Sequence, residues 1–233
     1  MLKKIFILVA MLGLSAMSWA DDTRDAAIDR LHHAGEVLHQ IMDTPDKGIP
    51  EEVLDHAKCI AVVPHLVKGG FIVGAEGGRG VATCRTGHGW SAPAFFDVEG
   101  GSWGLQIGVE GIDLVMIIQN DEGMRHLLGS KFQIGADASA AAGPVGRHAS
   151  ADTDWKLNAE ILTYSRAKGI FAGLTLNGAA VHGDGDAMRA FYGPDASVRA
   201  TLMGEVPPPP ASMPFLDAVR MAREQSKAAH EGQ

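Results

Sequence analysis

Side chains that can bind a metal gather on one segment near the start of the chain. Residues 22–42 have apolar side chains at helical spacing and are predicted to form an amphipathic helix. On its polar face, His32, Glu36 and His39 follow one another at spacings of four and three residues, and such groups suit a zinc-like metal. A further strong ligand is missing, as is the His-Glu-x-x-His order of a metalloprotease. We interpret these side chains as a solvated helix face and predict no metal site and no cofactor.

Two glycine-rich motifs have the composition of ligand-binding loops but lack the rest of the pattern. Residues 182–186, His-Gly-Asp-Gly-Asp, have none of the later acidic ligands of an EF-hand, so helix capping by the aspartates explains them better. Residues 77–80, Gly-Gly-Arg-Gly, precede a strand pattern and not the Gly-Lys and helix of a P-loop. The Gly-x-Ser-x-Gly motif of serine hydrolases is also absent. The sequence therefore predicts a protein that is not an enzyme.

The chain has two cysteines, Cys59 and Cys84. They lie near the ends of two predicted strands that can fold back on one another, so a disulfide is expected in an oxidising compartment. The alternative is a pair of separate buried thiols that behave as small apolar side chains. No Cys-x-x-Cys motif is present, and neither interpretation makes the cysteines catalytic.

The first twenty residues have the pattern of an export signal. Lys3 and Lys4 precede an apolar run, and Ser18-Trp19-Ala20 forms a small-x-small cleavage site before two aspartates. We expect cleavage after about Ala20 and a periplasmic or secreted mature protein.

The charge of the chain limits its partners. It has 20 Lys and Arg against 28 Asp and Glu, and removal of Lys3 and Lys4 with the leader changes the formal net charge from −8 to −10. Nucleic-acid binding needs a basic stripe, which is absent because the basic residues are scattered singly. Contact with an anionic bilayer would likewise have to use a local pocket or patch.

The elements that must position these residues are mostly strands. Residues 69–111 contain 13 of the 29 glycines among apolar residues, which is typical of twisted strands and tight turns. We predict helices at 22–42, 50–58 and 120–128, before Tyr192 and after Pro210, and a loop of small residues at 140–146. Strands are predicted at 59–63, 71–74, 80–85, 94–98, 102–109, 113–119, 132–136, 159–165 and 170–177. The aromatic side chains Trp90, Phe95, Phe96 and Trp103 are expected to fill the core rather than line a lipid-facing edge.

A series of motifs in fixed order resembles one known family, the SYLF domain. The matching segments are Ala57-Lys58-Cys59-Ile60-Ala61-Val62-Val63-Pro64, Gly70-Phe71-Ile72-Val73-Gly74, Gly78-Arg79-Gly80-Val81, Trp90-Ser91-Ala92-Pro93, Gly104-Leu105-Gln106-Ile107-Gly108, Gly143-Pro144-Val145-Gly146-Arg147, the run from Tyr164 to Gly173, and Phe191-Tyr192-Gly193. At Ala167 the chain departs from a serine common in that run. The resemblance covers about residues 30–193. It implies an α+β fold, with an antiparallel sheet or barrel-like core and flanking helices.

The resemblance also implies phospholipid binding, and in some relatives actin binding. An export signal makes actin implausible here, so we expect a non-enzymatic phospholipid-binding protein of the bacterial cell envelope. Arg147, Arg166 and Lys168 are the candidates for contacting a head-group phosphate. The alternative is a structural or protein-interaction module of the envelope, which the acidic first helix suits better than an anionic bilayer.

The expected organisation is one SYLF-type domain with tails. The signal peptide is placed at residues 1–20, the domain with its amphipathic helix at 21–205, a proline-rich linker at 206–213 and a helical tail at 214–233. The sequence leaves open the lipid, the membrane leaflet, the oligomeric state and whether the last helix packs on the domain or binds a partner.

Overall fold

The structure is a computed structural model that describes residues 2–43, 48–70, 73–103, 108–129, 131–144, 159–167, 170–173 and 178–231. Its helices are α1 (Leu2–Met42), α2 (Glu51–His56), α3 (Asp121–Leu127), α5 (Gly185–Tyr192), α6 (Val198–Leu202), the 3₁₀ turn η1 (Pro210–Ser212) and α7 (Met213–Glu231). Its strands are β1 (Cys59–Gly70), β2 (Val73–Thr86), β3 (Gly89–Trp90), β4 (Ala94–Trp103), β5 (Gly108–Ile118), β6 (Lys131–Gln133), β7 (Ala140–Ala142), β8 (Ile161–Ala167), β9 (Ile170–Gly173) and β10 (Ala180–Gly183).

The strands described here form one curled sheet with the order β6-β10-β4-β2-β1-β5-β8-β7, in which β3 pairs with β2 and β9 with β8. Every pairing is antiparallel except that of β7 with β8. The end strands β6 and β7 are joined by residues 134–139 alone, a length that spans at most about 20 Å. The sheet must therefore curl into a half-barrel, and the expected α+β class with a barrel-like core is confirmed.

The sheet has longer strands than the sequence predicted. The six short strands expected between residues 59 and 119 are four long ones, β1, β2, β4 and β5. Glycines that suggested turns lie within these strands, and at some of them neighbouring side chains leave little room for a Cβ. At Gly80, for example, a Cβ would lie 2.3 Å from Cζ of Phe96. The prediction of a loop at residues 140–146 is also wrong in part, because residues 140–142 form β7. This strand pairs with β8 through backbone groups, so its small side chains gave no strand pattern in the sequence.

Cys59 and Cys84 lie opposite one another in β1 and β2 and form a disulfide, as expected. Both residues are fully buried. The core expectation also holds for Phe95 and Phe96, which are 0% and 3% exposed. Trp90 is partly buried against the core, and the side chain of Trp103 lies outside the described part.

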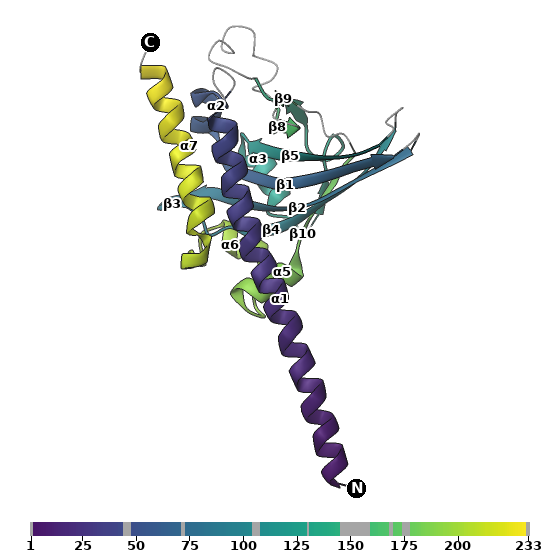
Figure 1. Ribbon diagram of the computed structural model, residues 1–233. Coiled ribbons are helices and arrows are strands. Elements are labelled where there is room, and N and C mark those ends of the chain that lie inside the picture. Colours follow the sequence, from purple (N-terminus) through teal and green to yellow (C-terminus); the bar gives the residue numbers. More distant parts are fainter. Residues whose placement is uncertain are drawn as a thin grey trace.

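Helix α1 packs across β1 and β2 with one stripe of its surface. Leu31, Ala34, Leu38 and Ile41 on this stripe are fully buried, in agreement with the predicted amphipathic pattern. The expected cleavage point after Ala20 falls inside the helix, whose first half extends away from the rest of the molecule in Figure 1. Among the helices that the structure describes, none combines the length and apolar character needed to span a bilayer.

Helix α7 packs beside α1, which answers a question the sequence left open. Phe215, Val219 and Ala222, the apolar stripe noted in the sequence, are 0%, 0% and 2% exposed. The contact is close, since a Cβ on Gly35 would lie 2.9 Å from the carbonyl oxygen of Pro214. The helices run side by side in the same direction, and the far ends of β1, β2 and β5 extend beyond them (Figure 1).

Candidate functional site

A bulge in the central strand β1 marks the candidate site. The register of β1 slips by one residue against both β2 and β5, around Pro64 and His65. Proline has no N–H for the ladder, so within a central strand it requires such a bulge. His65 has φ of 59° and is the one non-glycine residue with positive φ in the part of the chain that the structure describes. Strained backbone of this kind is frequent at functional sites.

Two neighbours on β5 stabilise this bulge. The backbone N–H of His65 donates to Oδ1 of Asp113, with 3.2 Å between N and Oδ1. The imidazole lies over Gly111, where a Cβ would be 2.5 Å from Cε1 of the ring. The ring therefore rests on bare backbone, and a side chain at this position on β5 would displace it.

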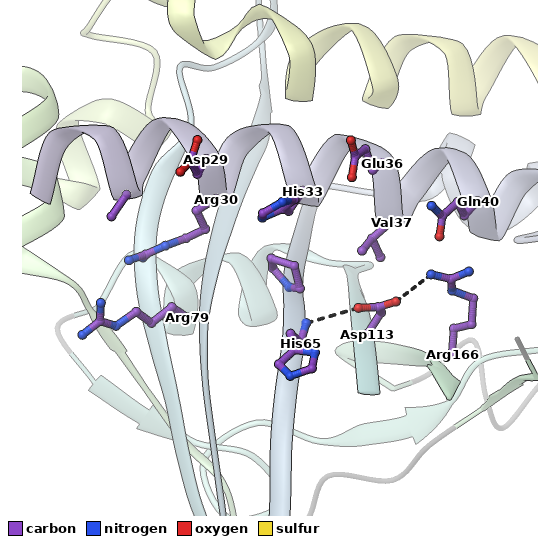
Figure 2. Close-up of a pocket in the computed structure, with 12 residues that line it drawn as sticks. Asp29, Arg30, His33, Glu36, Val37, Gln40, His65, Arg79, Asp113 and Arg166 are labelled. Carbon is purple, nitrogen blue, oxygen red and sulfur yellow. Dashed lines mark hydrogen bonds and ion pairs between the residues drawn. The ribbon is translucent and has the colours of Figure 1, made fainter. Parts of the chain in front are cut away.

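Asp113 also forms an ion pair with Arg166, which the sequence analysis predicts to contact a head group. It lies opposite Arg166 of β8, and the guanidinium donates to Oδ2 of Asp113 at 2.9 Å. Figure 2 shows Asp113 between His65 and Arg166, with one carboxylate joining both. The side chains of Arg166 and Asp113 are 26% and 20% exposed, so the pair is only half-buried.

Above the bulge, α1 forms the opposite wall of an open cleft of about 550 Å³. Its exposed residues Asp29, His33, Glu36 and Gln40 line that wall, while Val37 is buried beside them. The positions follow from helical periodicity, since residues three, four and seven apart share a face. The sheet wall consists of Pro64, His65, Arg79, Asp113 and Arg166 (Figure 2).

A buried ion pair fixes the position of α1 over the sheet. Arg30 is 7% exposed, and its Nη1 lies 3.0 Å from Oδ2 of Asp184. The guanidinium also stacks 5.4 Å from the ring centroid of Phe95. Asp184 accepts a hydrogen bond from the N–H of Ala187 and so caps α5, which confirms the capping role predicted for this motif. Nearby, burial and the charge of Asp184 raise the pKa of Asp97.

A second groove, of about 480 Å³, continues from the cleft over the long strands. The two share Pro64, His65 and Arg79. Arg79 is 72% exposed and lies 4.0 Å from Asp97, which is a loose ion pair. Beyond it the groove is lined by apolar or small residues together with two acids: Val67, Gly77, Gly78, Val98, Asp97 and Glu99.

Of the three predicted head-group contacts, the structure places Arg166 in the cleft, whereas Arg147 and Lys168 lie outside the described residues. Sequence reasoning missed His65, Arg79 and Asp113. One signal was available, because Pro64 follows an apolar strand run and a proline there indicates a bulge. His39, considered as a metal ligand, is paired with Asp43, with 2.6 Å between Nδ1 and Oδ2.

Comparison with known proteins identifies the class to which this fold and cleft belong. The family model described as "Ysc84: Las17-binding protein actin regulator" matches residues 99–222, more than half of the chain. The chain therefore belongs to the Ysc84 family, which is the SYLF family that the sequence motifs indicated.

Two curated relatives illustrate the extent of the match. SH3 domain-containing YSC84-like protein 1 of Homo sapiens is 34% identical over 167 residues, which cover 71% of this chain and 48% of that protein. LAS seventeen-binding protein 3 of Saccharomyces cerevisiae is 34% identical over 176 residues, which cover 73% of this chain and 38% of that protein. The match thus spans about half the length of the human relative and less of the yeast one. The family description denotes a binding protein and actin regulator, and the yeast name denotes a binding protein.

Proposed function

We propose that this protein is a non-enzymatic phospholipid-binding module of the bacterial cell envelope, in the periplasm or secreted. The leader pattern at residues 1–20 and the disulfide between Cys59 and Cys84 support export, since disulfides persist in oxidising compartments. The family provides a precedent for a binding role.

The observation that carries the lipid proposal is the continuity of the two grooves. A polar cleft with Arg79, His65 and Arg166 opens into a groove over Val67, Gly77 and Gly78, whose lining also includes Asp97 and Glu99. Val67, which lines the second groove, is 38% exposed. A phospholipid has the matching order of a charged head group followed by an apolar part, and arginine is well suited to phosphate. Arg147 and Lys168 remain proposed as further head-group contacts.

A protein partner in the envelope is the second candidate. The yeast relative is named for binding Las17, and the animal relatives are named for an SH3 domain. On this chain, α1 exposes Asp22, Asp25 and Asp29. An acidic helix face suits a basic protein surface better than an anionic bilayer.

Vesicle flotation tests the lipid proposal. The purified protein is floated with vesicles of graded anionic content at low and high salt, and co-flotation is expected. The variant Arg79→Ala should reduce bound protein about fivefold or more without lowering the thermal midpoint, because Arg79 is largely exposed and only loosely paired.

Arg220→Ala is the matched control. It removes the same charge from an exposed residue of α7 outside both grooves, and should leave flotation unchanged. Absence of co-flotation at every composition would contradict the lipid proposal and favour the protein partner. Equal losses in the two variants would show that charge in general, and not this cleft, determines binding.

A further inference from the structure

A run of four prolines, residues 207–210, connects α6 to α7 at the surface of the molecule. A proline fixes its own φ near −65°, and a residue that precedes a proline is restricted to extended ψ. Residues 207–209 meet both conditions, so the sequence alone restricts them to the polyproline II conformation. The backbone of Pro209, with φ of −68° and ψ of 155°, has this conformation. The run is therefore a short, stiff left-handed helix with three residues per turn.

The exposure of this run follows the same period of three residues. Val206 and Pro209 are three residues apart, share one edge of the helix and are both half-buried. Pro207 and Pro210 share the second edge, Pro208 lies on the third, and these three prolines are exposed. One edge of the helix therefore rests on the protein, while the other two present proline rings to solvent.

Both ends of the run are anchored in the folded domain. Before it, Leu202 is fully buried, and the N–H of Glu205 donates to the carbonyl oxygen of Ala200 at 3.0 Å. After it, the fully buried Ser212 donates from its N–H and from its Oγ to the carbonyl oxygen of Pro209, at 2.9 and 2.6 Å. A partner that binds this segment would lose little affinity to ordering it, because the conformation is already fixed.

The exposed edges have the features that a polyproline-binding groove recognises. Such grooves are lined by aromatic side chains, which accept prolines three residues apart, and the N–H or O–H of Trp or Tyr can donate to the ligand backbone. Pro207 and Pro210 have this spacing. The carbonyl oxygens of Pro207 and Pro208 accept no hydrogen bond within the described part of the chain. Just before the run, Met203 is 45% exposed and adds apolar surface.

Charge beside the run narrows the kind of groove that fits. Between Arg199 and Arg220 the sequence has two acids, Glu205 and Asp217, and no Lys or Arg. Glu205 directly precedes the run, is exposed and has no ion-pair partner among the residues that the structure describes. A groove with basic residues at its rim is therefore complementary, whereas an acidic rim would be repelled.

We infer that residues 207–210 are a docking site for a protein domain with an aromatic-lined groove and a basic rim, which binds the run in its polyproline II conformation. A mere connector between α6 and α7 needs fixed ends but not two exposed edges of proline rings. None of these residues lines the lipid cleft or the second groove. The inference is therefore independent of the proposed lipid binding and concerns a second surface of the molecule.

The first arm of the test titrates isotope-labelled probe domains with the purified protein and follows their NMR shifts. The probes are an EVH1 domain chosen for basic residues beside its aromatic groove and an SH3 domain chosen for acidic ones. The EVH1 domain should bind with a dissociation constant below about 1 mM, with shifts at its groove, and about fivefold or more tighter than the SH3 domain. Absence of binding by both probes, shifts away from the groove, or tighter binding of the SH3 domain would overturn the inference.

The second arm changes the run itself. Pro207→Ala should lose about fivefold in affinity for the EVH1 domain, because one of the two spaced rings is removed. Pro194→Ala is the matched control, since it makes the same change at an exposed proline outside the run, and it should bind like the wild type. Glu205→Lys keeps every proline and should reverse the preference between the two probes. Unchanged affinity in Pro207→Ala, the same loss in Pro194→Ala, or an unchanged preference in Glu205→Lys would overturn the assignment.

The third arm separates this surface from the lipid cleft. Arg79→Ala should bind the EVH1 domain like the wild type, and Pro207→Ala should float with vesicles like the wild type, because the two sites share no residue. Binding of the EVH1 domain without flotation on any vesicle would support the inference and contradict the proposed lipid binding. Flotation without binding of either probe domain would support the proposed function and contradict the inference.

Discussion

The two halves of β1 differ sharply although they belong to one strand. From Cys59 to Val63 every residue is at most 1% exposed, because the sheet curls around one face and helices cover the other. Beyond the bulge Leu66 is fully buried, while Val67 is 38% exposed. One strand thus contributes to a packed core at one end and to an open binding surface at the other. The bulge at Pro64 and His65 separates these roles.

The packed half should show the largest effects on stability. Phe215→Ala removes a fully buried ring of α7 that packs under α1, and should lower the free energy of unfolding by about 3–5 kcal/mol. Urea denaturation followed by circular dichroism measures this. Met221→Ala on the same helix, where the side chain is 42% exposed, should change stability by at most about 0.5 kcal/mol. If both variants have the same small effect, α7 does not depend on that contact.

Loss of the disulfide should have the next largest effect. Cys59→Ala with Cys84→Ala removes a link between residues 25 positions apart and should cost about 2–4 kcal/mol. The reduced wild type is the control and should show a similar loss in urea denaturation. Because the cysteines lie at the closed end of β1, head-group binding measured well below the unfolding transition should be unchanged. A binding defect there would mean that the two halves are coupled.

A substitution beneath the bulge should cause the smallest change in stability of the three, but a clear change in lipid binding. In Gly111→Ala the new Cβ would overlap the His65 ring, which can swing away at a cost of about 1–2 kcal/mol. The displaced imidazole should weaken lipid binding in the flotation assay. Gly87→Ala is the matched control, because a Cβ there meets nothing within 4 Å. Normal binding by Gly111→Ala would exclude the His65 ring from the site.

Local signals in the sequence predicted several elements correctly. Asn120 accepts from the N–H of Gly123 and caps α3, as the sequence indicated, and Asp184 caps α5 in the same way. The buried stripe of α1 and the cysteine pair were also predicted from the spacing of residues along the chain. Capping and amphipathic patterns depend on residues within one or two turns of a helix, so they can be recognised without knowledge of the fold.

The site depends instead on contacts between distant parts of the chain. Asp113 meets Arg166 across a separation of 53 residues, and Arg30 meets Asp184 across 154. No local pattern indicates that a bulge in β1 would place a carboxylate of β5 beside a guanidinium of β8. Arg166 was predicted from its basic charge and family motif. Its partner Asp113 could be predicted only from the register of β5 against β8.

The packing of α1 against α7 affects the order in which parts of the chain can fold. Residues near 35 pack on residues near 214, so the outer helical layer joins an early-synthesised segment to one of the last. Until α7 has left the ribosome, the buried stripe of α1 lacks part of its cover, and contacts of such high sequence separation form late. This architecture would delay final closure until nearly the whole polypeptide is available.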